Sequence, residues 1–356
     1  MAGSFFLSLI LTGLVKIFAQ RADFVSHPVS DRYAERTVPL GGGIAILITL
    51  TAFIFPATFL IKFLPGHLEY LAEKANIELA DFLAKVNQLI VILISALVLL
   101  VLGLWDDKKR LGPFFKLAVQ FAVAISAAIF ADVKVEFFIE NKIITSLMSA
   151  FWIVLIINAF NFLDNMDGLS AGIAAIGSCI LFAAAATSGQ VFVGGLAIVL
   201  IGTLLGFLIF NFPPAKIFMG DAGSLVVGFF VAILTLRTTY YHEAESGRWY
   251  AVLMPLVVMA VPLYDFISVT LLRISQGRSP FVGDTQHFSH RLKRRGWTDT
   301  QTVLTLYLAT LCAGIGAAFL NQVNPAGAIL IFIQTFMILA VIAILEKNTG
   351  NDKSSN

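Results

Sequence analysis

Long apolar runs alternate with short polar connectors along almost the whole chain. A run of about 20 apolar residues is typical of a transmembrane helix, because such a helix spans a hydrocarbon core about 30 Å thick. The pattern predicts an all-α polytopic membrane protein with about eleven transmembrane helices. The windows lie at 2–20, 40–64, 87–105, 114–131, 144–162, 169–188, 191–211, 222–240, 249–272, 302–320 and 325–345. They form one membrane domain over residues 1–347, followed by a polar tail over 348–356.

The composition agrees with a membrane protein and excludes a soluble domain. Hydrophobic residues make up 58% of the chain and charged residues 13%, and the mean hydropathy is +0.88. Cys179 and Cys312 lie inside apolar runs, so no disulfide framework is predicted. Residues 133–143 differ from the other connectors, because β-branched and aromatic residues surround Glu140-Asn141, and they favour a small external β-hairpin.

The basic residues predict the orientation, since cytoplasmic loops carry an excess of Lys and Arg. If the connectors after helices 1, 3, 5, 7 and 9 and the C-terminal tail are cytoplasmic, that side holds 17 of the 24 Lys and Arg residues. This assignment gives an external N-terminus and a cytoplasmic C-terminus. It also places every unusual polar segment on the cytoplasmic side.

The most polar of these segments is 158–168, with Asn158, Asn161, Asp164, Asn165 and Asp167 at the end of an apolar run. An acidic side chain costs about 3 kcal/mol at the bilayer centre and much less at the interface. The segment therefore predicts a polar site at the membrane surface. Asp164 and Asp167 share a face if the segment is helical, which suits a cation or a phosphate-bound metal. A solvated turn between helices would use the same residue types.

Two further segments combine acidic residues with helix ends. Asp106 and Asp107 follow an apolar run, and adjacent carboxylates at an interface suggest a metal, a cationic partner or proton transfer. The alternative is an acidic cap neutralised by Lys108-Lys109-Arg110. In 211–224, paired prolines break the helix, Phe218 can stack on a flat base, and Asp221 begins the next helix. The alternative for Asp221 is an N-cap, worth about 1 kcal/mol.

The basic segment 279–296 contains His287 and His290, three residues apart. A histidine pair among basic residues suits a polyanion such as a diphosphate better than a divalent metal. The alternative is a juxtamembrane segment that contacts anionic lipid headgroups. The first connector, with Arg36 and Gly41-Gly42-Gly43, favours an ordinary link with glycine-rich helix packing.

Read together, four motifs resemble the polyprenyl-phosphate N-acetylhexosamine-1-phosphate transferases. They are Gly-Leu-Trp-Asp106-Asp107, the 158–169 stretch, Phe218-Met-Gly-Asp221-Ala-Gly-Ser224 and Gln286-His287-Phe-Ser289-His290. The chain looks more like the WecA/TagO branch, which takes UDP-N-acetylglucosamine, than the MraY branch, whose tight run of three histidines is absent here. Eleven helices also fit the WecA/TagO branch better than the ten of MraY. Ser289 departs from the His-Ile-His-His pattern of the WecA/TagO branch.

This resemblance implies transfer of N-acetylglucosamine-1-phosphate from UDP-N-acetylglucosamine to undecaprenyl phosphate, with release of UMP. The reaction would initiate synthesis of a cell-envelope polysaccharide at the bacterial inner (plasma) membrane. It implies Mg²⁺, with Mn²⁺ as a substitute, and a membrane lipid partner. A homodimer is compatible with it, and no nucleic acid partner is expected.

The resemblance also implies the roles of individual residues. Asp221 and Asp164 are the expected metal ligands. The expected catalytic residues are Asp106, Asp107, Asp164, Asp167, His287 and His290. The expected substrate-binding residues are Lys116, Asn161, Asn211, Phe218, Arg291 and Arg36.

Two other functions remain open from the sequence. One is an MraY-like phospho-MurNAc-pentapeptide transferase, and the other is a secondary transporter. Transporter sites usually lie near the bilayer midplane, whereas the acidic residues here gather at helix ends. Only Asp265 lies well within a predicted span, and it is predicted to orient a neighbouring group rather than to relay protons.

Overall fold

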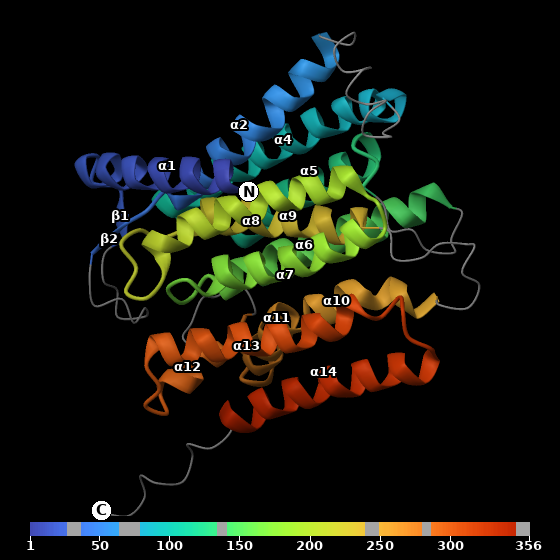
Figure 1. The fold of residues 1–356 in the computed structure, drawn as a ribbon. Helices are drawn as coiled ribbons and strands as arrows, with labels where there is room; N and C mark the ends of the chain where they lie inside the picture. The colour runs from blue at the N-terminus through green and yellow to red at the C-terminus, as the bar shows by residue number, and fades with distance from the viewer. Residues whose placement is uncertain (27–36, 64–78, 134–140, 239–248, 280–285, 347–356) are drawn as a thin grey trace, which may run out of the picture.

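The computed structural model describes residues 1–26, 37–63, 79–133, 141–238, 249–279 and 286–346. Long helices lie alongside one another and make up most of the described chain (Figure 1). The helices are α1 (Ala2–Arg21), α2 (Gly42–Phe63), α4 (Leu79–Lys108), α5 (Pro113–Phe130), α6 (Lys142–Leu163), α7 (Leu169–Thr187), α8 (Val191–Asn211), α9 (Gly220–Arg237), η1 (Trp249–Leu253), α10 (Met254–Val258), α11 (Ala260–Ser275), α12 (Phe288–Lys293), α13 (Asp299–Ala318) and α14 (Pro325–Glu346).

The predicted all-α membrane architecture is confirmed. Among the described residues, nine helices are long and apolar enough to cross a membrane, and a bent helix pair can be a tenth span. The apolar helix α2, whose side chains are described over Gly42–Pro56, coincides with the remaining predicted window. Each predicted window therefore corresponds to a helix or to the bent pair.

The bent pair is the largest departure from the predicted spans. The window at 249–272 is divided into η1, α10 and α11, with a bend of 66° between Trp249–Val258 and Ala260–Ser275. Pro262 has no N–H to donate to the carbonyl of Val258, so the helical hydrogen-bond ladder is interrupted there. The bend directs α11 toward the polar end of the molecule, where Asp265 and Arg273 are both buried.

The small sheet lies elsewhere than predicted. Strands β1 (Val25–Ser26) and β2 (Val38–Pro39) pair antiparallel, within the first connector. The hairpin predicted at 133–143 is wrong for residues 142–143, which belong to α6. The side chain of Asn141 accepts hydrogen bonds from the backbone N–H groups of Ile143 at 3.0 Å and Ile144 at 3.3 Å, which is an N-cap. Residues 134–140 lie outside the described part of the chain.

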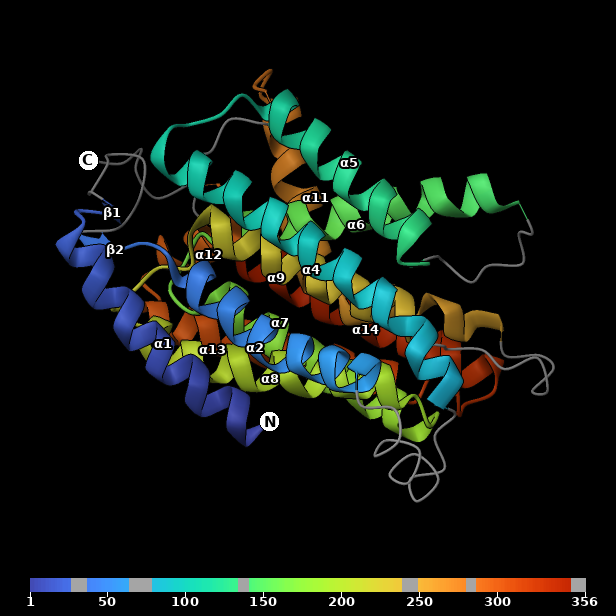
Figure 2. The same ribbon diagram turned by 90° about the horizontal axis from the view of Figure 1, so that it is seen from above.

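Helix α9 lies at the centre of the helix bundle (Figure 2). Every residue from Ala222 to Thr235 is buried, and α9 packs against α2, α4, α6, α7 and α8. Near its start, the backbone of α9 lies very close to the backbones of α4 and α2. A Cβ added at Gly103 of α4 would lie 2.3 Å from Cα of Ala222, and one added at Gly43 of α2 would lie 2.4 Å from the backbone N of Gly223. The start of α9 is therefore held between α4 and α2 with almost no freedom to shift.

Candidate active site

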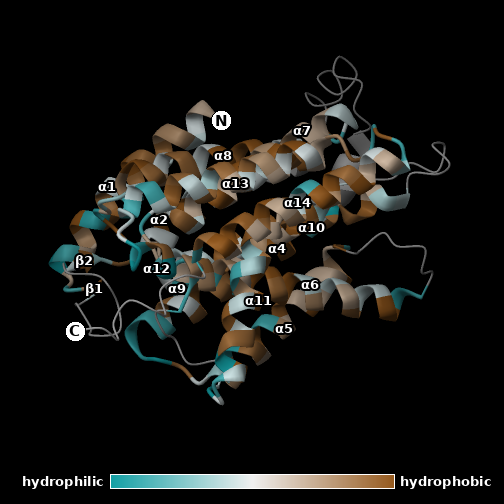
Figure 3. Cartoon of the chain, turned by 90° about the horizontal axis from the view of Figure 1, so that it is seen from below, coloured by the Kyte–Doolittle hydropathy of each residue, from teal (hydrophilic) through white to brown (hydrophobic). Residues whose placement is uncertain are grey.

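Polar helix ends gather at one end of the molecule, near β1, β2 and α12 (Figure 3). Three helices, α4, α6 and α8, end there, and α5, α7 and α9 begin there. Predicted site residues on α4, α5, α6, α8 and α9, and in the connector before α7, thus lie at the same end, as expected for a site at a membrane surface.

The first group of residues at this end is the carboxylate cluster, consisting of Asp106, Asp107, Lys116 and Asp221. Lys116 Nζ lies 2.6 Å from Asp106 Oδ2 and 2.8 Å from Asp221 Oδ2. A hydrogen bond of 2.7 Å from the backbone N–H of Leu111 to Asp106 Oδ1 fixes the first carboxylate. Two carboxylates that are far apart in sequence therefore converge on one cation, and all three side chains keep some exposure to solvent.

Asp107 has a different role from its neighbour. Its carboxylate accepts hydrogen bonds from the backbone N–H of Asp221 at 2.9 Å and of Ala222 at 3.2 Å. These are the unpaired N–H groups at the start of α9, whose own N-cap residue, Met219, makes no side-chain cap. Asp107, at the end of α4, thus caps the start of α9. The capping role that the sequence suggested for Asp221 is performed by Asp107. Gly220 has φ of +71°, and a Cβ there would lie 2.6 Å from Asp107 Oδ2.

Asn211 and Asp167 link the segment between α6 and α7 to the segment between α8 and α9. Asn211 Oδ1 accepts from the backbone N–H of Gly168 at 3.1 Å, and its Nδ2 donates to the carbonyl of Ile217 at 2.9 Å. Asp167 Oδ2 accepts from the backbone N–H of Ala215 at 2.8 Å. Asn211 is only 3% exposed. Both side chains therefore hold loop backbone in place, and they shape a site more than they offer groups to a ligand.

Asn161 and Phe218 lie at the edges of the carboxylate cluster. Asn161 Nδ2 donates to Ser224 Oγ at 2.9 Å, one turn after Asp221 on α9. The backbone N–H of Phe218 donates to the carbonyl of Pro39 at 2.8 Å, and its carbonyl accepts from Gly42 N–H at 3.0 Å. The first connector therefore borders the site. Arg36, predicted to bind substrate, lies outside the described residues.

The second group is the histidine cluster, which consists of Asp265, His287, His290 and Arg291. His287 Nδ1 lies 2.8 Å from Asp265 Oδ2, and the backbone N–H of Phe288 donates to Asp265 Oδ1 at 3.2 Å. Asp265 is completely buried, whereas His287 is 5% exposed. The orienting role predicted for Asp265 agrees with this geometry.

His290 and Arg291 have distinct environments in this cluster. Burial lowers the pKa of His290 to about 4, and the nearby charges of His287, Lys293 and Arg294 act in the same direction. Arg291 Nη2 forms an ion pair of 2.9 Å with Glu346 Oε2, at the end of α14. An anion that binds Arg291 must therefore compete with Glu346.

The end of α6 links the two clusters. The ring of Phe162 meets the ring of His287 edge-on at 5.7 Å, and the guanidinium of Arg273 lies 5.0 Å from the Phe162 ring centroid. Ser289 Oγ donates to Asn165 Oδ1 at 2.5 Å. Asp164, the C-cap residue of α6, lies between these contacts in the sequence. A movement of α12 is thus coupled to the segment that carries Asn161 and Asp164.

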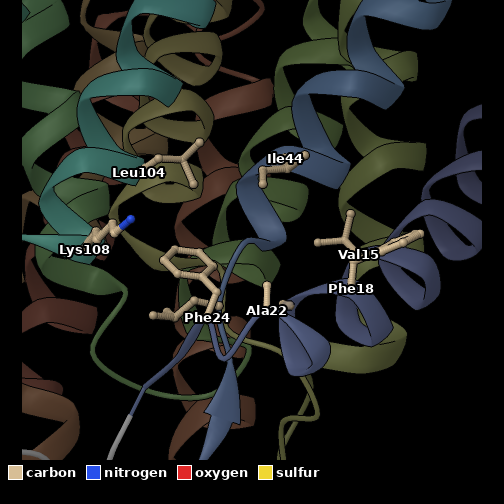
Figure 4. A pocket seen from close by; sticks show the side chains of 9 residues that line it. Val15, Phe18, Ala22, Phe24, Ile44, Leu104 and Lys108 are labelled. Carbon is tan, nitrogen blue, oxygen red and sulfur yellow. The ribbon is translucent and has the colours of Figure 1, made fainter.

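An apolar groove is separate from both clusters (Figure 4). It has a volume of about 510 Å³ and lies between α1, the β1 and β2 segment, α2 and α4. Lys108 is the one charged residue in its lining, and no predicted site residue lines it. The groove is therefore not the candidate active site.

Comparison with known proteins shows the family of this chain. The glycosyl transferase family 4 model matches residues 89–239, a range that contains the whole carboxylate cluster. The probable undecaprenyl-phosphate N-acetylglucosaminyl 1-phosphate transferase of Bacillus subtilis is 30% identical over 346 residues, which cover 95% of this chain and 87% of the relative. The chain belongs to this family of transferases.

Other relatives have similar coverage. The decaprenyl-phosphate N-acetylglucosaminephosphotransferase of Mycobacterium leprae is 30% identical, covering 94% of this chain and 87% of the relative. The undecaprenyl-phosphate alpha-N-acetylglucosaminyl 1-phosphate transferase of Thermotoga maritima is 25% identical, covering 98% of both chains. These alignments extend across the histidine cluster, which lies beyond the range matched by the family model.

The carboxylate cluster is the part of this transferase that fits a divalent cation. Among the described residues no group of three or more His, Cys, Asp or Glu side chains could hold a metal ion. Mg²⁺, however, is commonly held by one or two carboxylates together with substrate phosphates. Asp106 and Asp221 already share one cation, the Lys116 ammonium. The structure thus brings Asp221 and Asp106 together on Lys116, and the role of Asp164 as a metal ligand stays a prediction.

Several residues of the site were not predicted from the sequence. Ser224, Phe162 and Glu346 contact the predicted residues Asn161, His287 and Arg291 through side chains, and Arg273 lies over the Phe162 ring. Arg273 and Glu346 carry a signal, because each is a charged residue near the end of an apolar helix. Ser224 and Phe162 have no such signal, since Ser and Phe are ordinary residues at helix ends.

Proposed function

We propose that this protein transfers N-acetylglucosamine-1-phosphate from UDP-N-acetylglucosamine to undecaprenyl phosphate, releasing UMP. The names of the relatives in Bacillus subtilis and Thermotoga maritima support this donor and this acceptor. The observation that carries the proposal is the convergence of Asp106 and Asp221 on Lys116 at the polar end of the bundle.

The reaction must bring two anions together, a lipid phosphate and a nucleotide diphosphate. Phosphoryl transfer depends mainly on positioning and on charge neutralisation. Asp221 and Asp106 would hold Mg²⁺, which when bound neutralises charge on the diphosphate. Lys116 would neutralise the lipid phosphate, and His287, His290 and Arg291 would bind the diphosphate or the leaving UMP. Asn161 and Phe218 would border the uridine.

We favour direct attack of the lipid phosphate on the β-phosphorus of the sugar nucleotide. The second ionisation of a phosphate monoester lies near pH 6, so the acceptor is already an anionic nucleophile at neutral pH. The carboxylates, in contrast, are engaged, because Asp107 accepts two backbone N–H groups while Asp106 and Asp221 share Lys116. A covalent route would have to break one of these arrangements.

Purified protein in detergent, given UDP-N-acetylglucosamine, undecaprenyl phosphate and Mg²⁺, should form the lipid diphosphate sugar and an equal amount of UMP. Turnover of UDP-MurNAc-pentapeptide alone would instead support the MraY-like alternative. No turnover of either donor, with transport activity in proteoliposomes, would support the transporter.

The one-step route has a separate test. The enzyme is incubated with donor and without lipid acceptor, and the protein is then examined by mass spectrometry. We expect no stoichiometric release of UMP and no phosphosugar adduct. An adduct on Asp106, Asp107 or Asp221 that passes to added lipid at the turnover rate would contradict direct attack.

We also propose that the polar end faces the cytoplasm, with the N-terminus outside. The charge asymmetry of the connectors supports this orientation. In a variant without Cys179 and Cys312, a cysteine at exposed Arg278 should resist an impermeant reagent in intact cells, whereas one at exposed Gln322 should react. The reverse labelling pattern would invert the orientation.

A further inference from the structure

Asp265 makes two contacts with the histidine motif through one buried carboxylate. Its Oδ2 lies 2.8 Å from His287 Nδ1, and its Oδ1 accepts from the backbone N–H of Phe288 at 3.2 Å. Helix α12 has only six residues, and its N-cap residue, His287, makes no side-chain cap. Asp265 thus supplies from α11 the acceptor that the start of α12 otherwise lacks.

The contact with His287 determines which imidazole nitrogen carries a proton. A carboxylate can only accept a hydrogen bond, so Nδ1 must be the protonated nitrogen. In the neutral ring, Nε2 is then left as the acceptor. The ring is also fixed in orientation, because its edge contacts Phe162, the residue after Asn161.

We propose that Asp265 is a positioning residue that fixes the tautomer and the orientation of His287 toward the substrates. This inference rests on the proposed function for the identity of those substrates. At metal-bound histidines, replacement of the group that orients the ring commonly costs about 10- to 100-fold in affinity or activity, and we expect a loss of the same order here. Burial of a full carboxylate beneath a six-residue helix is explained by this role, whereas a neutral acceptor would suffice for the cap alone.

The substitution Asp265→Asn separates the two roles. The N–H of Phe288 can only donate, so the Asn carbonyl oxygen must keep that position and the cap is retained. The amide NH₂ then faces His287 Nδ1, which has to become the acceptor. The variant should therefore stay folded while the proton moves to Nε2.

The tautomer can be read directly in protein labelled with ¹⁵N-histidine, in nanodiscs at pH 8, with the resonance assigned by His287→Gln. We expect Nδ1 to be the protonated nitrogen in the wild type and Nε2 in Asp265→Asn. An unchanged tautomer would overturn the proposal. This readout does not depend on activity, so it stands apart from any failure of the proposed function.

Kinetics provide the second test. Asp265→Asn should lower kcat by about 10- to 100-fold with little change in KM for undecaprenyl phosphate. The double variant with His287→Gln should be no slower than His287→Gln alone, because both changes act through one group. Additive losses would contradict the proposal. Asp299→Asn is the matched control, since Asp299 pairs with Lys293 of α12 at 2.8 Å but, with 38% of its side chain exposed, is not buried as Asp265 is.

Discussion

The carboxylate cluster and the histidine cluster differ in how their charged groups are paired. The first sets three carboxylates, Asp106, Asp107 and Asp221, against the single ammonium of Lys116. In the second, on and beside α12, Arg291 pairs with Glu346 and Lys293 pairs with Asp299. The first region is therefore suited to an additional cation, whereas an anion that binds the second must compete with a carboxylate already there. A reaction between two phosphates needs the charge of both to be neutralised at one membrane surface.

The two regions are also held in place by different means. Backbone packing at Gly43 and Gly103, and the Asp107 carboxylate against Gly220, fix the start of α9. The histidine cluster depends instead on side-chain contacts, including Asp265 with His287 and Ser289 with Asn165. Changes in the first region should therefore affect chemistry or folding strongly, whereas changes in the second should be graded.

The largest effect is expected from Asp221→Asn. The substitution keeps the size of the side chain but removes one of the two charges that converge on Lys116. Turnover should fall by about 10³-fold or more, since charge stabilisation is the main contribution in phosphoryl transfer. Initial rates with radiolabelled UDP-N-acetylglucosamine measure the loss, and an unchanged melting temperature is the control. Near-normal turnover at low Mg²⁺ would show that Asp221 does not hold the metal.

Asp107 should differ from Asp221 in the kind of defect that it produces. Asp107→Ala removes the acceptor for two N–H groups at the start of α9, which should cost about 1 to 2 kcal/mol of stability. Asp107→Asn keeps one acceptor oxygen and should lose less. Thermal unfolding in detergent distinguishes the two variants. Equal melting temperatures for Ala, Asn and wild type would mean that the cap contributes nothing.

The helices were predictable because apolar windows reflect the thickness of the bilayer. The bend near Met259 was not, since proline inside a transmembrane window leaves the position and size of a kink open. The β1–β2 sheet of the first connector was not predicted. The hairpin predicted at 133–143 is wrong for residues 142–143, because β-branched Ile143 resembles a strand residue while Asn141 caps helix α6.

The site was predictable to the extent that its residues are charged at helix ends. Asp106, Lys116 and Asp221 were all predicted as site residues, yet their mutual pairing depends on packing between α4, α5 and α9. Asn211 shows the opposite limit. The family resemblance implied that it binds substrate, whereas in the structure its amide bonds to Gly168 and Ile217, and nothing local in the sequence indicates those partners.

A smaller effect is expected where the family motif departs from histidine. Ser289→Ala removes the donor to Asn165 Oδ1 and should weaken the link between α12 and the end of α6. A single hydrogen bond contributes about 0.5 to 1.5 kcal/mol, which corresponds to a change in KM for the sugar nucleotide of up to about tenfold. Ser275→Ala, whose exposed hydroxyl bonds only within α11, is the control. Identical KM values for both variants would mean that this link does not reach the substrate.

A pH dependence of stability is also expected, and it arises from His290. Burial lowers its pKa to about 4 in the folded protein, whereas an unfolded histidine titrates near 6.5. Between these values the unfolded state binds a proton that the folded state does not, so stability is lost as the pH falls from 6.5 toward 4. The slope for one group is at most about 1.4 kcal/mol per pH unit. The negative charge of Asp265 opposes this lowering of the pKa, while the positive charges of His287, Lys293 and Arg294 add to it.

Melting temperatures of wild type and His290→Gln at several pH values isolate the contribution of His290, because all other groups titrate in both proteins. The two curves should converge or cross toward acid as the wild type loses its contribution, and parallel curves would show that His290 is not held neutral by its burial.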